Sequence, residues 1–115
     1  MNFVDFLAET KLGLSVDMAP YYVGMPLNLD EKSEIEKITW YAKVFPLNHY
    51  CEIRVDKGLT RSHIYAHGDS MNGAILALVD KIKKHEYIGV CTMYYKEKKN
   101  DLDYFVAVPK DLEYK

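Results

Sequence analysis

The 115-residue chain contains little cysteine and no long hydrophobic segment. Its two cysteines, Cys51 and Cys91, lie far apart and form no CxxC pair. A disulfide or redox pair is therefore not indicated, and we expect two buried, reduced thiols. No apolar run approaches the roughly 20 residues that span a bilayer. The first residues lack the basic flank and apolar stretch of a signal peptide. These absences predict a cytoplasmic protein without a membrane partner.

An excess of one charge is also absent. The chain carries 15 Lys and Arg residues against 17 Asp and Glu residues, which gives a net charge of −2. It therefore exerts no general attraction on phosphate backbones, and nucleic acid is an unlikely partner. Only Arg54 and Arg61 are arginines, a bias that suggests an AT-rich genome such as that of a phage or a low-GC bacterium. The length fits one domain over residues 1–115.

Catalytic and metal-binding motifs are absent as well. There is no GxSxG elbow, and Ser70 is better explained as a helix cap than as a nucleophile. His63 and His67 form an HxxxH pair, but in the expected strand four residues span about 13 Å. A single ion with bonds of about 2 Å does not reach both side chains. We therefore predict no catalytic residue, no metal ligand and no cofactor, and an enzyme is the third-ranked alternative.

Hydrophobic periodicity predicts two helices. The first is expected over residues 2–12, with Asn2 as its cap and Gly13 as its stop. The second begins after Asp69 or Ser70, either of which suits a helix cap. An apolar stripe at helical spacing follows, made of Met71, Ala74, Ile75, Leu78, Val79 and Ile82.

Alternating polar and apolar residues predict the strands. In the stretch 38–45, Trp40 falls on one face with Ile38, Ala42 and Val44. Turn signals occur at 46–48, and Lys57-Gly58 is expected at the tip of a hairpin. The expected strands cover 20–29, 38–45, 49–56, 61–67, 87–95 and 102–109, with a charged loop or helical turn over 30–37.

The order of these elements predicts an α+β fold. It reads helix, strand, strand, then strands, helix, strand, strand, which makes two αββ or βαββ units. Such a pattern favours an antiparallel sheet with helices packed on one side.

This pattern resembles the GyrI-like domain, the ligand-binding module of several AraC-type regulators. The stretches that carry the resemblance are TRSHIYAHGDS (60–70), AILALVDKI (74–82) and MYYKEKKNDLDYFVAVP (93–109), with 21–45 as the hairpin of the first unit. The resemblance implies a groove between two βαββ units, with the family's first strand missing here. The family usually has an acid four positions before the final proline, where this chain has Phe105, so Asp103 is the nearest acid.

Aromatic residues supply the candidate site. Rings with polar tips make good ligand walls and interface anchors. We predict a non-enzymatic binding protein that holds a small apolar or aromatic molecule, with Asp103 available to a cationic group. The alternative is a phage-encoded inhibitor or adaptor that binds a host enzyme such as gyrase. The residues predicted to bind the ligand are Trp40, Tyr94, Tyr95, Asp103, Tyr104 and Phe105.

Overall fold

The predicted α+β class is confirmed by a computed structural model, which describes residues 1–23, 34–92 and 104–115. Its strands pair antiparallel, and its elements follow the predicted order. In chain order they are α1 (Phe3–Thr10), β1 (Leu12–Val23), β2 (Glu34–Pro46), β3 (Cys51–Val55), β4 (Ile64–Gly68), α2 (Met71–Lys83), β5 (Tyr87–Thr92) and β6 (Tyr104–Ala107).

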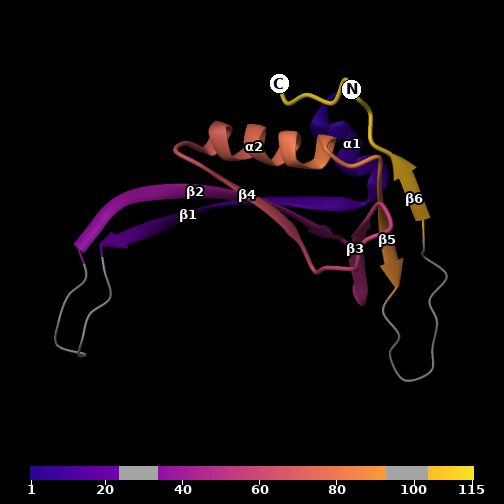
Figure 1. Cartoon of the computed structure of the whole chain (residues 1–115), viewed down its shortest axis with the longest axis horizontal. Coiled ribbons are helices and arrows are strands. Elements are labelled where there is room, and N and C mark those ends of the chain that lie inside the picture. The colour runs from indigo at the N-terminus through magenta and orange to yellow at the C-terminus, as the bar shows by residue number, and fades with distance from the viewer. Residues whose placement is uncertain (24–33, 93–103) are drawn as a thin grey trace.

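The strands form two three-stranded sheets, with the orders β1-β2-β4 and β3-β5-β6. Figure 1 shows α2 lying along one face of the first sheet, with β5 and β6 beside its C-terminal end. The expected hairpin across Lys57-Gly58 is confirmed as a chain reversal with an antiparallel bridge, but it does not continue as a strand pair, because β4 pairs with β2 in the other sheet. Asp56 has a φ of 50°, in the left-handed region, and the chain leaves β3 there. One isolated bridge between Ile53 and Arg61 precedes β4.

A long antiparallel ribbon of β1 and β2 dominates the first sheet (Figure 1). The strand expected over 20–29 begins earlier than predicted, since β1 starts at Leu12, and the predicted part over 24–29 lies outside the described residues. The expected loop over 30–37 was wrong for Glu34–Lys37, because pairing with β1 holds this charged stretch in β2. Ala42 and Val44 are buried as predicted, whereas Ile38 is 51% exposed.

Helix α1 begins where the sequence indicates and ends earlier. Asn2 Oδ1 accepts a hydrogen bond from the Val4 amide at 2.9 Å, which confirms the cap. The predicted stop at Gly13 is wrong, because Lys11 ends the helix with a left-handed φ of 55°. Gly13 instead lies in β1 beneath the ring of Phe45, and a Cβ there would lie 2.6 Å from Phe45 Cζ.

Helix α2 matches its predicted cap and most of its stripe. Ser70 Oγ accepts from the Gly73 amide at 3.0 Å. Met71 departs from the prediction and is 48% exposed, since side chains lean toward the helix N-terminus and a first-turn side chain points past the helix end. The rest of the stripe is buried: Ala74, Ile75, Leu78, Val79 and Ile82.

One buried cluster joins both helices and both sheets. It includes Phe3 and Phe6 of α1, Leu78 of α2, Val44 of β2 and Ile53 of β3. Apolar burial of this kind is the main favourable contribution to folding. In the described part of the chain, neither helix has the length and apolar character needed to cross a membrane.

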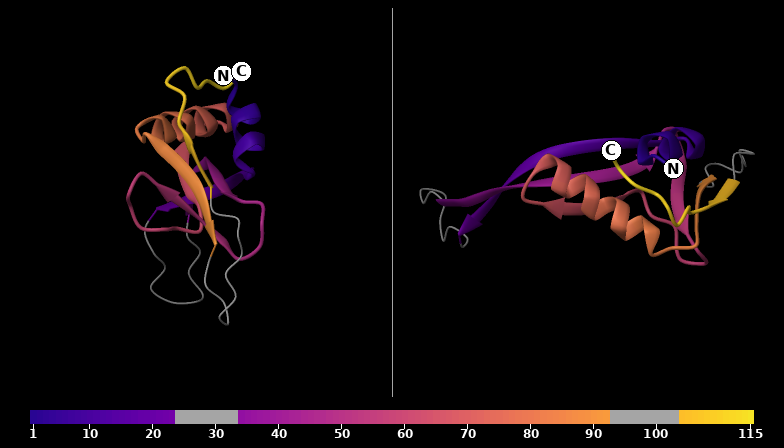
Figure 2. Two further views of the ribbon diagram at one scale, coloured as in Figure 1. Left: turned by 90° about the vertical axis from the view of Figure 1, so that its right-hand side faces the viewer. Right: turned by 90° about the horizontal axis from the view of Figure 1, so that it is seen from above.

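The last residues of the chain fold back onto its beginning. Leu112 is 1% exposed and belongs to the core. The Glu113 backbone exchanges hydrogen bonds with Met1 (3.0 Å) and Phe3 (2.7 Å), and the Met1 amino group lies 3.1 Å from Asp111 Oδ2. The two chain ends therefore lie side by side, as both views of Figure 2 show.

Both thiols are buried and free of disulfide bonds, as predicted. Cys51 pairs with Thr92, and Glu52 pairs with Cys91. Cys51 shares its face of the sheet with buried Ile53, and the register places Cys91 on the opposite face. The thiols therefore lie on different sides of the sheet and are not placed to form a bond with each other.

Candidate functional site

The structure places the described members of the predicted site on two different sheets. Trp40 lies in β2 opposite Met18 and Gly68, and it is half-buried against the core. Tyr104 and Phe105 lie in β6 of the other sheet. The remaining predicted residues, Tyr94, Tyr95 and Asp103, lie outside the described residues.

Tyr104 points inward and has a structural contact. Its hydroxyl donates to the Thr10 carbonyl oxygen at 2.5 Å, which ties β6 to the end of α1. Burial raises the pKa of the Tyr104 hydroxyl, and nearby Cys51 adds to the effect. The ring is half-buried and packs against the core.

Phe105 points outward and is 45% exposed. It pairs with Gly89 of β5, and its ring leans over this glycine. A Cβ at Gly89 would overlap both Phe105 Cδ1 and the Tyr104 carbonyl oxygen. Glycine is therefore required here by the close approach of the neighbouring strand.

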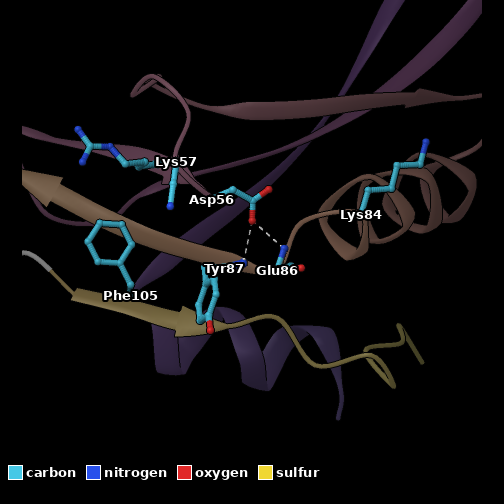
Figure 3. Close-up of a pocket in the computed structure, with 7 residues that line it drawn as sticks. Asp56, Lys57, Lys84, Glu86, Tyr87 and Phe105 are labelled. Atoms are coloured by element: carbon cyan, nitrogen blue, oxygen red, sulfur yellow. Dashed lines mark hydrogen bonds between the residues drawn. The ribbon is translucent and has the colours of Figure 1, made fainter.

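The outward side of the sheet β3-β5-β6 carries a connected surface. Arg54, Gly89 and Phe105 form one row across the three strands, and Tyr87 lies two residues before Gly89 on the same face. An open depression of about 780 Å³ lies over this surface. We call this surface the β5 face, lined by Arg54, Asp56, Lys57, Lys84, Glu86, Tyr87 and Phe105 (Figure 3).

Asp56 organises one edge of the β5 face. Its carboxylate accepts hydrogen bonds from the Glu86 amide (2.7 Å) and the Tyr87 amide (3.1 Å), drawn in Figure 3. His85 Nδ1 lies 2.9 Å from its other oxygen. The His85 hydrogen bond, followed by the two backbone amides, lowers the pKa of Asp56. The Asp56 charge is therefore already met by donors within the protein.

The positively charged side chains of the β5 face, unlike Asp56, have no oppositely charged partner among the described residues. Within residues 1–23, 34–92 and 104–115, no ion pair is formed by Arg54, Lys57 or Lys84. Glu86 is the one other carboxylate among the described lining residues. Since Asp56 is engaged with His85 and two amides, the surface offers a ligand more positive than negative charge.

The β5 face brings aromatic and cationic side chains together. It combines two exposed rings, Tyr87 at 51% and Phe105 at 45%, with three cations. Its described lining includes no cysteine, serine or histidine. Across the described parts of the chain, no three His, Cys, Asp or Glu side chains gather to hold a metal ion.

Sequence reasoning found Phe105 but missed its neighbours. The alternation in 49–56 places Arg54 outward, and Tyr87 is a polar-tipped ring at a strand start. These signals are local. What brings Arg54 beside Phe105 is the pairing of β3 and β6 on either side of β5, which joins segments far apart in the chain.

No protein-family model, curated protein or solved structure matches the chain. The likeness to the GyrI-like domain therefore rests on the sequence patterns, and the function is inferred from the chemistry of the β5 face.

Proposed function

We propose that this chain is a non-enzymatic binding protein that holds a small aromatic anion on the β5 face. The observation that carries this proposal is the pair of exposed rings, Tyr87 and Phe105, beside three cations that form no ion pair in the described part of the chain. The GyrI-like pattern of the sequence supports a binding role.

The rings are spaced for stacking. Tyr87 lies opposite Ala107 and Phe105 lies opposite Gly89, so the two aromatics are diagonal neighbours on adjacent strands. Diagonal positions are about 7–8 Å apart, within reach of aromatic side chains. A planar ligand gains about 1–3 kcal/mol for each ring that stacks on it. An aromatic molecule therefore suits this surface better than an aliphatic one.

The charges select the sign of the ligand. Arg54 shares a row with Phe105, so its guanidinium can approach the edge of a ring stacked there and form two hydrogen bonds with a carboxylate or phosphate. Lys57 and Lys84 add positive charge at the rim. The sequence predicts that Asp103 could bind a cationic group of the ligand, but Asp103 lies outside the described residues. The charges of the described surface favour an anionic ligand instead.

Isothermal titration and chemical-shift mapping test the proposal with three matched probes. Naphthalene sulfonate is the anion, naphthalene methanol the neutral analogue and naphthylmethylammonium the cation. We expect the anion to bind most tightly and the cation most weakly. Equal affinity for the neutral and anionic probes would overturn the charge assignment, and no binding of any probe would overturn the site.

Two variants locate the interaction. Arg54→Gln removes the charge that is nearest in register to Phe105, and Phe105→Leu removes the ring while keeping an apolar side chain over Gly89. We expect each to weaken binding of naphthalene sulfonate roughly fivefold or more, the equivalent of about 1 kcal/mol. Lys110→Gln, an exposed lysine that lines neither depression, is the matched control. An unchanged Kd for both test variants would place the binding elsewhere.

A further inference from the structure

A second set of rings and basic side chains lies on the outer side of the sheet β1-β2-β4. His63, Tyr65 and His67 alternate along β4 and the residue before it, which places them on one face. The opposite face is buried beneath α2. We call this surface the histidine face: it borders a depression of about 420 Å³ and is lined by Tyr41, Lys43, His63, Tyr65 and His67.

Both imidazoles are held in place by neighbours. The His67 ring lies 5.9 Å from the Tyr41 ring and 5.5 Å, edge-on, from the Tyr65 ring. The His63 ring lies 5.5 Å from the Tyr65 ring, and His63 Nδ1 lies 2.9 Å from Ser62 Oγ. The rings of His63 and His67 therefore lie on either side of the Tyr65 ring.

Cations surround this series. Lys43 of β2 pairs with Tyr65 and forms no ion pair with any described residue. Lys81 of α2 reaches around the sheet edge, where its Nζ donates to the Tyr65 carbonyl oxygen at 2.8 Å and lies 5.1 Å from the Tyr65 ring centroid. The lining of the depression contains no carboxylate among the described residues.

The nearest carboxylates lie at the margin and have partners. Asp17 of β1 is opposite Tyr41, one strand beyond His67, and accepts from Ser15 Oγ at 3.2 Å. Asp69 follows β4 and lies 3.8 Å from Lys37 Nζ. Asp17 and Asp69 do not line the depression, so neither carboxylate lies between the imidazoles and a ligand bound there.

We propose that the histidine face binds an extended acidic segment of a partner protein, and binds it more tightly at pH 6 than at pH 8. His63 and His67 lie four residues apart, about 13 Å along a strand, and Lys43 lies beside the midpoint at Tyr65. Measured along this segment, the steps from His63 to Tyr65 and from Tyr65 to His67 match the two-residue repeat of about 6.6–6.8 Å in an extended chain, and Lys43 lies beside the middle position on the neighbouring strand. Alternate carboxylates of an extended peptide therefore meet all three basic groups.

The pH dependence follows from the chemistry of imidazole. Histidine is the side chain that ordinarily changes charge between pH 5 and 8. An anion binds the protonated form better, so by linkage its affinity rises as the pH falls. Lys43 and Lys81 add cationic attraction beside the imidazoles. Tyr41 and Tyr65 add the amphipathic contact area that is common at protein interfaces.

A protein partner is favoured over nucleic acid by the whole-chain charge. The net charge of −2 gives no long-range attraction to a polyanionic backbone. A short acidic segment is recognised locally and depends less on this field. Single-stranded DNA is therefore the competing ligand that the test includes.

The four histidines of the chain serve as reporters in an NMR experiment. A short peptide that alternates glutamate and threonine is added, and histidine ring shifts are followed at pH 6 and pH 8. We expect shifts at His63 and His67 and none at His49. His85 contacts Asp56 on the β5 face, so it reports binding there and separates this proposal from the proposed function. The same peptide with glutamine in place of glutamate is the control.

Variants measure the contribution of each group. We expect His63→Gln and His67→Gln each to weaken binding about two- to fivefold at pH 6, the range of an exposed ion pair, with little effect at pH 8. Lys43→Gln should weaken binding at both pH values, and His49→Gln should change neither. Thermal unfolding checks that each variant is folded.

Three outcomes would overturn the proposal. Equal binding of the glutamine peptide would remove the role of charge. Equal affinity at pH 6 and pH 8 would remove the role of the imidazoles. Tighter binding of a single-stranded DNA oligonucleotide, with the same His63 and His67 shifts, would assign the face to nucleic acid.

Discussion

At the residue scale, Asp56 shows how one carboxylate fixes the edge of a candidate site. It adopts a left-handed φ of 50°, a conformation that Asp tolerates better than most residues. From there it accepts hydrogen bonds from the Glu86 and Tyr87 amides and from His85. The turn after β3 and the start of β5 are thereby joined beside the exposed ring of Tyr87.

Asp56→Asn should lower the melting temperature at pH 7. Asn keeps the left-handed preference and an accepting oxygen, so the change removes mainly the charge. Because the pKa of Asp56 is lowered in the folded state, its contribution is present above the unfolded pKa of about 3.9 and is lost as the pH falls through the folded pKa. The difference from the wild type should therefore shrink toward pH 3 in circular-dichroism melts. The control is Asp80→Asn on the exposed side of α2, and a pH-independent difference would contradict the prediction.

Tyr104→Phe should destabilise the protein by about 0.5–1.5 kcal/mol, the usual net value of one hydrogen bond. The change removes the donor to the Thr10 carbonyl oxygen. Since burial raises the pKa of Tyr104, its contribution is present below the unfolded pKa of about 10 and is lost as the pH rises through the folded pKa. Urea denaturation measures the difference, with Tyr65→Phe as the exposed control. Equal stability of wild type and Tyr104→Phe would show that the hydrogen bond contributes nothing.

At the element scale, glycine sets how closely neighbours approach. Gly68, the last residue of β4, lies against the backbone of Gly73 and Ala74 in α2. Gly89 allows Phe105 to cover β5. The second sheet can present Arg54 and Phe105 on either side of β5 because the residue between them has no side chain.

Gly89→Ala should cost about 1–3 kcal/mol of stability, the range for overpacking a close contact. The added methyl would overlap both a ring and a backbone oxygen, and the backbone oxygen cannot move without shifting β6. Gly58→Ala is the control, because its Cβ would lie 3.2 Å from the Val55 oxygen at an exposed turn. Chemical denaturation compares the two. A Gly89→Ala protein as stable as Gly58→Ala would mean that β6 adjusts freely.

Local sequence patterns predicted the elements better than their partners. The Asn2 cap, the Ser70 cap and the buried stripe of α2 depend on a few neighbouring residues and were predicted correctly. Leu12, Leu14 and Val16 alternate with smaller or polar residues, which is a local signal for the first part of β1.

The division into two sheets depends on long-range pairing. Val55 of β3 pairs with Ile88 of β5, and Trp40 of β2 pairs with Gly68 of β4. No local pattern specifies which strand pairs with which. For the same reason the sequence identified Phe105 as a candidate ligand-binding ring without revealing Arg54 beside it. The α+β class could be predicted from element order, whereas the β5 face could not.

At the scale of the whole molecule, the chain is elongated. Its radius of gyration is 17.1 Å and its extents are 51 × 39 × 21 Å, against about 13 Å expected for the radius of a compact domain of this length. Figure 1 shows the β1–β2 ribbon extending beyond α2, and two apolar side chains of the ribbon, Met18 and Ile38, are more than half exposed. The shared core therefore lies toward the end where the two sheets meet.

Leu112→Ala should cost about 2–5 kcal/mol, as truncation of a buried leucine usually does. Leu112 is 1% exposed and lies beside Glu113, which bonds to the start of the chain, so its loss loosens the packing of α1 as well. Leu47→Ala, at 59% exposure, should stay within about 0.5 kcal/mol of the wild type. Thermal and urea unfolding measure both. Similar values for the two variants would show that the final segment does not contribute to the core.

The meeting of the chain ends makes this protein a candidate for circular permutation. Met1 and Glu113 are already hydrogen-bonded, so a short linker can join the old ends without crossing the core. New ends can be opened beside Leu59, which is 88% exposed between β3 and β4. Such a rearranged chain would make β3 and β4 terminal segments while leaving every strand pairing available, so sheet assembly could be studied independently of the native chain order.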